Sequence, residues 1–346
     1  MKEKITFKID GQIVEAEAGM NILDAALAND IYIPHLCHHD DLVPVGACRM
    51  CGVEVDSGKM VMSCMTPVRD GIDVITDSPD IQATRKVTMN LLIADHYMDC
   101  LACEAADDCG LLTVAAYLGI QPESQDGIRP MGRNLPIDTS NPFFQFDSNK
   151  CILCGICVRT CEEIVGLGAL GYINRGFKTV VGTFGDKGFV DSICESCGEC
   201  VYRCPVGALV PKKPQLAARE VRSTCVYCGV GCGIYYGIKG DQIVSVRADR
   251  ESPANQGSLC VKGRYGFKFV NHPDRLTTPL IKENGEFREA SWDEAFELIA
   301  SKFKKSKGKK FAALTSAKCT NEENYLVQKL TRAVMGTNTI DHCARL

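Results

Sequence analysis

The sequence contains no long hydrophobic run and no export signal. No stretch approaches the roughly 18 consecutive apolar residues that a membrane-spanning helix needs. The chain begins MKEKI, which lacks the apolar core of a secretory signal peptide, and no pair of arginines precedes such a core. These absences argue against export and membrane insertion, so we expect a cytoplasmic protein without a transmembrane segment.

The sequence also lacks an excess of positive charge. It has 39 Lys and Arg residues against 43 Asp and Glu residues, which gives a formal net charge of −4. Nucleic-acid-binding domains usually carry a basic patch or stripe, so we expect no nucleic-acid partner. The single basic run, residues 302–310, is interpreted as the solvated end of a helix.

Cysteine, in contrast, is abundant, with 21 among 346 residues. Disulfide scaffolds are short secreted chains that cannot build a sufficient core, whereas this chain is long and 45% hydrophobic. Metal ligation therefore explains the cysteines better. Zinc also binds CxxC pairs, but triplets such as Cys151-x2-Cys154-x2-Cys157 suit a four-iron cluster, which takes three ligands from one tight loop and one from elsewhere.

Nineteen of the cysteines fall into five groups with the spacing of iron–sulfur ligand sets, and one histidine completes the second group. The candidate metal ligands are Cys37, Cys48, Cys51, Cys64, His96, Cys100, Cys103, Cys109, Cys151, Cys154, Cys157, Cys161, Cys194, Cys197, Cys200, Cys204, Cys225, Cys228, Cys232 and Cys260. The remaining Cys319 and Cys343 are interpreted as packed thiols and not as ligands.

The first group lies in a segment predicted to fold as a β-grasp ferredoxin domain. Residues 3–14 indicate a hairpin that turns at Asp10-Gly11, and Asn21 is a suitable cap for the helix that follows. The spacing C-x10-C-x2-C-x12-C resembles the [2Fe–2S] domain of the large NADH-dehydrogenase subunit of respiratory complex I, and differs from plant-type ferredoxins. Three histidines flank Cys37 and are interpreted as surface or neighbouring groups, not ligands: His35, His38 and His39.

The second group follows a predicted helix that starts at Ser78-Pro79 and runs towards His96. Its motif, His96-x3-Cys100-x2-Cys103-x5-Cys109, resembles the histidine-ligated [4Fe–4S] module that follows the [2Fe–2S] domain in the same family. A neutral imidazole in place of a thiolate makes a cluster less negative, which raises its reduction potential.

The third and fourth groups form an internal duplication, CILCGICVRTC at 151–161 and CESCGECVYRC at 194–204. Two copies of CxxCxxCxxxC resemble a two-cluster bacterial ferredoxin. That resemblance implies a crossover in which Cys204 completes the first cluster and Cys161 the second.

Residues 119–147 are interpreted as a linker. The glycine-rich residues between the copies, 166–188, are interpreted as an inserted hairpin, because they lack the GxxxxGK[ST] of a phosphate loop.

The last group, Cys225-x2-Cys228-x3-Cys232-x27-Cys260, does not have a ferredoxin spacing. It resembles the N-terminal [4Fe–4S] domain of molybdopterin oxidoreductases, a family that includes formate dehydrogenases and assimilatory nitrate reductases. Two short strands predicted at 233–238 and 242–247 fit the small β-rich body of that domain. In the family, a lysine just past the fourth cysteine lies between cluster and pterin. The resemblance therefore implies a cofactor-binding, electron-relay role for Lys262.

After residue 275 the pattern predicts an α/β unit. It has a buried strand at 311–315, a helix opened by a capping box at Thr320–Glu323 and ended by Gly336, and a second strand from Thr339. This unit resembles the start of a pterin-binding domain, and SAKCTNEENY and IDHCARL resemble the formate dehydrogenase branch. In that branch the molybdenum ligand, cysteine or selenocysteine, comes next. We therefore expect a chain truncated at a UGA selenocysteine codon, with no catalytic residue of its own.

The sequence thus predicts an α+β multi-module iron–sulfur protein. The expected domains are a [2Fe–2S] β-grasp domain at 1–78, a helical [4Fe–4S] domain with one histidine and three cysteine ligands at 79–118, a linker at 119–140, a two-cluster [4Fe–4S] ferredoxin-type domain at 141–215, a molybdopterin oxidoreductase [4Fe–4S] domain at 218–274 and the first part of an α/β molybdopterin-binding domain at 275–346.

The resemblance implies the N-terminal part of a formate dehydrogenase α-subunit. One [2Fe–2S] and four [4Fe–4S] clusters would relay electrons between a molybdenum or tungsten bis-molybdopterin guanine dinucleotide centre, where formate and CO₂ interconvert, and flavin- or NADH-binding diaphorase-type subunits or ferredoxin. Two alternatives remain open. One is a non-catalytic electron-transfer subunit of a complex I-like NADH dehydrogenase. The other, an iron-only hydrogenase subunit, fits less well because the cysteines after the duplication have the molybdopterin-type spacing.

Overall fold

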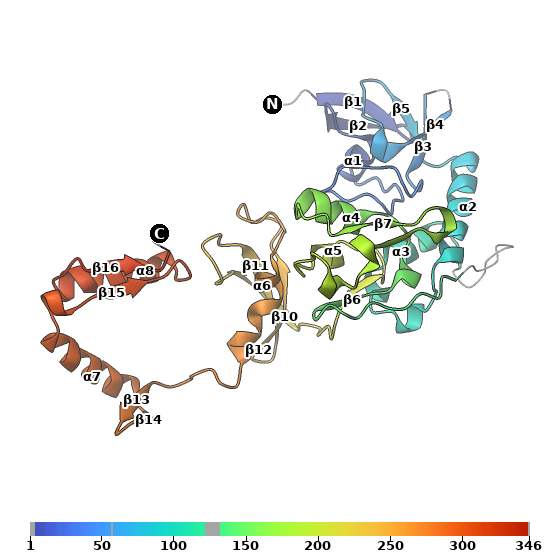
Figure 1. Ribbon diagram of the computed structural model, residues 1–346. Coiled ribbons are helices and arrows are strands. Elements are labelled where there is room, and N and C mark those ends of the chain that lie inside the picture. Colours follow the sequence, from blue (N-terminus) through green and yellow to red (C-terminus); the bar gives the residue numbers. More distant parts are fainter. Residues whose placement is uncertain (1–3, 57, 122–131, 345–346) are drawn as a thin grey trace. The chain divides into compact units, whose positions relative to one another are not determined.

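The computed structural model describes residues 4–56, 58–121 and 132–344. The chain divides into two compact units, residues 1–213 and residues 214–346, and each is described by itself (Figure 1). Within the described residues, no helix combines the length and the apolar character that crossing a lipid bilayer requires.

The first unit begins with a five-stranded sheet in the order β2-β1-β5-β3-β4. Its strands are β1 (Lys4–Ile9), β2 (Gln12–Glu17), β3 (Gly52–Val55), β4 (Lys59–Met62) and β5 (Asp73–Ile75). Helix α1 (Ile22–Leu27) shares the hydrophobic core of this sheet. The predicted hairpin and helix cap are confirmed, since Asn21 Oδ1 accepts a hydrogen bond from the Asp24 N–H at 2.8 Å. Cys51 and Cys64 belong to the same core, which therefore holds two of the four cysteines of the first group in place.

Two helices follow the sheet, α2 (Pro79–Asp95) and α3 (Gly110–Tyr117). Helix α2 begins as predicted, with the Ser78 hydroxyl accepting a hydrogen bond from the Ile81 N–H at 3.3 Å. Its buried Met89 and Ile93 share a core with α3 and with the cysteine motifs of the duplication. His96 is the residue directly after α2, so the packing of this helix positions the histidine.

The duplication forms two similar loops, each ending in a short helix, α4 (Ile156–Arg159) and α5 (Glu199–Tyr202). In both copies the residue before the second cysteine and the glycine after it have positive φ; they are Leu153, Ser196, Gly155 and Gly198. In both copies, too, a backbone N–H donates to the sulfur of the first cysteine at 3.4 Å, from Leu153 and from Ser196. The sequence repeat is therefore a repeat of backbone conformation.

Two small antiparallel pairs complete the first unit. Strand β6 (Phe144–Phe146) pairs with β9 (Leu209–Pro211), and β7 (Leu170–Ile173) pairs with β8 (Val180–Thr183). The second pair confirms the predicted inserted hairpin. The first corrects the predicted linker at 119–147, because 144–146 pair with a strand that follows the duplication; residues 122–131 of that linker lie outside the described residues.

The second unit opens with a three-stranded sheet, β10 (Arg219–Thr224), β11 (Gly233–Lys239) and β12 (Gln242–Ala248). The predicted pair of strands joined at Gly240 is confirmed by β11 and β12. Helix α6 (Val261–Tyr265) follows Cys260 directly.

The rest of the second unit contains the hairpin β13 (Leu280–Glu283) and β14 (Glu286–Glu289), helix α7 (Trp292–Lys305), and a βαβ unit of β15 (Ala313–Thr315), α8 (Asn321–Lys329) and β16 (Ile340–His342). β15 and β16 are parallel, and the Thr320–Glu323 capping box is present, both as predicted.

Two expectations for this unit are wrong. The strand at 311–315 is not buried, because among the described residues β15 pairs with β16 alone and Leu314 is 79% exposed. Cys319 and Cys343 are both exposed and not packed thiols. Each lies in a turn at an end of this two-stranded sheet, where no described element covers it.

Candidate iron–sulfur sites

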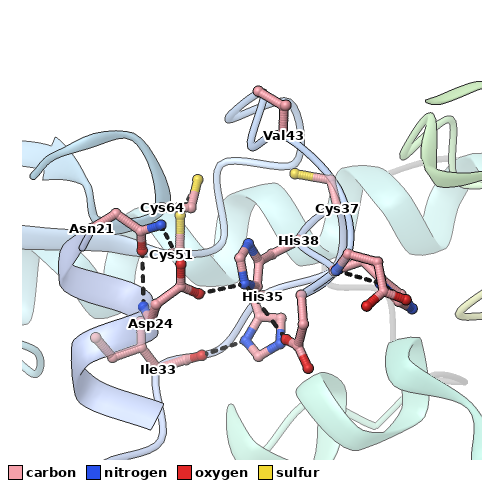
Figure 2. Close-up of polar contacts among 12 residues, drawn as sticks. Asn21, Asp24, Ile33, His35, Cys37, His38, Val43, Cys51 and Cys64 are labelled. Carbon is pink, nitrogen blue, oxygen red and sulfur yellow. Dashed lines mark hydrogen bonds and ion pairs between the residues drawn. The ribbon is translucent and has the colours of Figure 1, made fainter. Parts of the chain in front are cut away.

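The first cysteine group forms two pairs of sulfur atoms in the loops and turns after α1, and Figure 2 shows the pair of Cys51 and Cys64. Cys51 Sγ and Cys64 Sγ lie 3.3 Å apart. Cys37 Sγ accepts a hydrogen bond from the Cys48 N–H at 3.4 Å, and the two side chains also hydrogen-bond. Two thiolates about 2.3 Å from one tetrahedral metal lie roughly 3.8 Å apart. Two close pairs therefore fit a [2Fe–2S] cluster, which has two irons with two thiolate ligands each.

The three histidines beside Cys37 do not join its sulfur pairs. His38 is buried, and its Nε2 lies 2.8 Å from Asp24 Oδ1, while His35 Nδ1 lies 2.8 Å from the Ile33 carbonyl oxygen (Figure 2). His39 Nδ1 accepts a hydrogen bond from the Asp41 N–H at 3.2 Å. These contacts fit the interpretation of neighbouring groups, although His38 is not at the surface.

The second group lines one cavity, with His96, Cys100, Cys103 and Cys109 all in its wall. His96 Nδ1 is buried and has no hydrogen-bond partner within the described residues. Burial, together with the nearby cations Lys150 and Arg133, lowers the pKa of His96 to about 4. The imidazole is therefore neutral at physiological pH, which is the form that binds metal. The orphaned nitrogen and the three thiols fit a [4Fe–4S] cluster.

The duplication supplies two further cavities, and each takes one cysteine from the other copy. One is lined by Cys151, Cys154, Cys157 and Cys204, and the other by Cys161, Cys194, Cys197 and Cys200. The groupings are those of the crossover that the ferredoxin resemblance implies. Burial raises the pKa of Cys157 and of Cys200, so these thiols need the positive charge of a metal to lose their protons.

These sites touch one another through short segments of chain. Gly207, three residues after Cys204, leaves no room for a side chain, because a Cβ built on it would lie 2.4 Å from Cys103 Sγ. The Gly110 N–H, next to Cys109, donates to the Pro205 carbonyl oxygen at 2.8 Å. Residues 205–207 therefore separate the Cys151 cavity from the His96 cavity.

The last group lies in the second unit, around the start of α6. The Cys225 N–H donates to the Cys232 carbonyl oxygen at 2.8 Å. Burial raises the pKa of Cys232, and the nearby thiols of the other three cysteines raise it further. These four thiols are more open than those of the first unit, since Cys228 and Cys260 are exposed. Lys262 is exposed on α6 two residues after Cys260.

No group of three or more His, Cys, Asp or Glu side chains in the described part of the chain is drawn together tightly enough to hold one metal ion. A four-iron cluster has a different requirement, because each protein ligand binds a different iron of the cube. Its ligands must line a cavity, which is the arrangement seen around His96 and in the duplication.

Family comparisons match successive parts of the chain. Residues 2–79 match a 2Fe-2S iron-sulfur cluster binding domain, 85–123 an NADH-ubiquinone oxidoreductase-G iron-sulfur binding region, and 141–210 the ferredoxin-like domain of NADH-quinone oxidoreductase subunit 3. Residues 218–272 match the molybdopterin oxidoreductase Fe4S4 domain and 275–346 match molybdopterin oxidoreductase itself. The chain belongs to the molybdopterin oxidoreductase family. Its first unit carries iron–sulfur domains like those of the G-type NADH-quinone oxidoreductase proteins.

Curated relatives of this chain have several names. The alpha subunit of the NADPH-Fe(3+) oxidoreductase of Geobacter sulfurreducens is 36% identical over 99% of this chain and 40% of its own length. The G 2 subunit of the NADH-quinone oxidoreductase of Rhizobium meliloti is 35% identical over 99% of this chain and 40% of its own length. A putative formate dehydrogenase of Staphylococcus haemolyticus is 30% identical over 100% of this chain and 39% of its own length. The chain therefore spans about two fifths of these relatives.

A solved structure resembles part of the chain. A chain of the NAD+-reducing [NiFe]-hydrogenase, in its H2-reduced state, has a TM-score of 0.57 and 31% sequence identity, and the match covers 62% of this chain and 90% of that chain.

The cysteines and His96 can be recognised in the sequence because their spacing is local. Arg85, Arg159 and Gly207 were not recognised, because they reach the sites only through folding. The sequence signal for Gly207 is its place two residues after Pro205, and the signal for Arg159 is its place within the motif CILCGICVRTC, whereas Arg85 has none.

Proposed function

We propose that this chain is the electron-relay part of a formate dehydrogenase α-subunit. The observation that carries the proposal is the order of its domains, in which the iron–sulfur modules lead into a molybdopterin oxidoreductase Fe4S4 domain and then a molybdopterin domain. Relatives named putative formate dehydrogenase align with the whole chain, and the formate-type segments at 316–325 and 340–346 support the same interpretation.

In this proposal the clusters supply one-electron transfer, and the residues of the chain hold and separate them. The Cys225 group would receive electrons from the pterin centre, with Lys262 as the relay. The two cavities of the duplication would come next. The Cys151 cavity adjoins the His96 cavity through 205–207, and Arg159 of its loop hydrogen-bonds the Cys37 loop. These two contacts support two routes for electrons from the Cys151 cluster, one to the His96 cluster and one to the Cys37 cluster.

The interconversion of formate and CO₂ would be catalysed by residues outside this chain. The ligand of molybdenum or tungsten and the substrate-binding groups would belong to the part of the relatives that this chain does not span. The expected selenocysteine codon stays a prediction. The acceptor would be a flavin- and NADH-binding partner of the kind found in NADH dehydrogenases, or ferredoxin.

The test is to purify the native complex that contains this chain, without oxygen, and to measure its metals and its formate-dependent reduction of NAD and of a viologen dye. Molybdenum or tungsten with formate activity is expected. A Cys228→Ser variant should lose formate-dependent NAD reduction, whereas Cys319→Ser, which changes another exposed cysteine of the same unit, should keep it. Formate-dependent NAD reduction that survives Cys228→Ser would contradict electron transfer through the Cys225 group.

A second function is supported by the relatives with the higher identities, whose names are those of an NADPH-Fe(3+) oxidoreductase and an NADH-quinone oxidoreductase. In this case the chain would transfer electrons from NADH or NADPH and catalyse no reaction of formate. The same purification distinguishes the two, since iron without molybdenum or tungsten, together with clusters that NADH reduces and formate does not, would favour this second function.

A further inference from the structure

Two arginines are buried against the loops that carry the first cysteine group, and each comes from a different module. Arg85 lies on α2, and its side chain is among the largest that are fully buried, at 1% exposed. Its Nε donates to the Met50 carbonyl oxygen at 3.1 Å and its Nη2 to the Gly52 carbonyl oxygen at 2.8 Å. These two carbonyls flank Cys51, so Arg85 holds the backbone on both sides of a candidate ligand.

Arg159 makes a corresponding contact with the loop that carries Cys37. It lies at the end of α4, between Cys157 and Cys161, and is 8% exposed. Its Nη2 donates to the Cys37 carbonyl oxygen at 2.6 Å and its Nη1 to the Val43 carbonyl oxygen at 2.6 Å. One guanidinium thus holds the backbone on both sides of Cys51, and another holds the backbone at Cys37.

Neither arginine forms an ion pair with a carboxylate among the described residues. The buried Arg203, which is as exposed as Arg159, shows the contrast, because it pairs with Glu199 and Asp41. Arg85 and Arg159 donate to backbone carbonyls, and each keeps one buried nitrogen, Nη1 and Nε respectively, with no hydrogen-bond partner in the described part of the chain. A buried charge without a counterion is costly, so a negative group close to each guanidinium would offset that cost. Cys51 interacts electrostatically with Arg85, and Cys37 with Arg159.

A [2Fe–2S] cluster with four thiolate ligands is such a group. It carries net negative charge, and reduction adds one more electron. A nearby cation favours the reduced form, which is the more negative one. The effect is stronger for a buried cation, because solvent and salt screen it less than they screen a surface charge. Arginine stays protonated at any working pH, so this effect does not depend on titration.

We propose that Arg85 and Arg159 set the reduction potential of the [2Fe–2S] centre, holding it higher than its cysteines alone would. This inference rests on the proposed iron–sulfur function. It also links the two contacts to electron transfer along the chain. Arg85 comes from the helix that leads to His96, and Arg159 from the loop between two cluster cavities, so the potential depends on both neighbouring modules being packed in place.

The test is an anaerobic redox titration of the purified chain, following the [2Fe–2S] signal by electron paramagnetic resonance, with Arg85→Gln and Arg159→Gln. At the wild-type midpoint, each variant should show at least a tenfold lower ratio of reduced to oxidised cluster, which is a shift of about 59 mV to lower potential. Arg69→Gln is the matched control, because it removes the same charge from the domain that carries the first cysteine group, at a side chain that is 61% exposed. It should leave the midpoint unchanged.

Lysine variants separate charge from structure. Arg85→Lys and Arg159→Lys keep the cation but cannot reach two carbonyls in the same way, and they should restore most of the wild-type potential. If a glutamine variant assembles no cluster, the lysine variant at the same position tests the proposal. A wild-type potential in that lysine variant would support the proposal, and a tenfold shift of its ratio of reduced to oxidised cluster would contradict it. Unshifted midpoints in glutamine variants that contain the full amount of cluster would overturn only this proposal about the arginines. The absence of any [2Fe–2S] signal in the wild type would overturn the proposed function.

Discussion

Replacing Gly207 with alanine should remove one of the four-iron clusters and leave the others. The added Cβ would lie 2.4 Å from Cys103 Sγ, which is about 1.1 Å short of the roughly 3.5 Å at which non-bonded atoms attract. Overpacking of this size costs typically about 1–3 kcal/mol. A sulfur displaced by about 1 Å cannot keep a metal–sulfur bond of about 2.3 Å. The cavity that loses its ligand is the one that also contains His96.

The assay is iron content together with low-temperature electron paramagnetic resonance of the reduced chain. Gly207→Ala should lose about four of the roughly 18 iron atoms that one [2Fe–2S] and four [4Fe–4S] clusters contain. Gly171→Ala is the matched control, since its Cβ would meet no atom within 4 Å and its backbone has no positive φ. Wild-type iron and an unchanged spectrum in Gly207→Ala would refute the packing argument and the placement of Cys103 as a ligand.

Three further outcomes are expected. His96→Cys should lower the potential of one [4Fe–4S] cluster by more than about 59 mV, a tenfold change for one electron, because a thiolate adds negative charge where a neutral imidazole stood; an unchanged redox titration would exclude His96 as a ligand. Cys343 should react with iodoacetamide faster in the 346-residue chain than in its Ser316→Ala variant, because the Ser316 hydroxyl lowers the pKa of Cys343 and so raises its thiolate fraction below about pH 9; equal rates, measured by peptide mass spectrometry, would contradict this. Asn21→Ala should lower the free energy of unfolding by about 1 kcal/mol in urea, since the Asp24 N–H loses its acceptor; an unchanged midpoint would show that the cap contributes nothing.

The parts of the fold that could be predicted are those set by neighbouring residues. The hairpin at Asp10-Gly11, the caps at Asn21 and Ser78 and the capping box at Thr320 all form as the local sequence indicates. The same holds for the grouping of cysteines, because CxxC spacing confines three ligands to one loop. His96 could be recognised only because three cysteines follow it closely.

The parts that could not be predicted depend on which surfaces meet after folding. In the sequence Arg85 is an ordinary residue of a helix, and nothing local indicates that its guanidinium reaches the carbonyls beside Cys51, more than thirty positions away. The expectation of packed thiols at Cys319 and Cys343 failed for the same reason, since it assumed a covering element that the described residues do not provide.

We propose that the chain holds one two-iron and four four-iron clusters on the ligands named above. The most direct measurement is Mössbauer spectroscopy of the chain purified without oxygen after growth on ⁵⁷Fe, combined with metal analysis. We expect about 18 iron atoms per chain, with roughly one ninth of the absorption from a [2Fe–2S] centre and the rest from [4Fe–4S] centres. Zinc in place of iron, or four-iron absorption for two clusters or fewer, would contradict it.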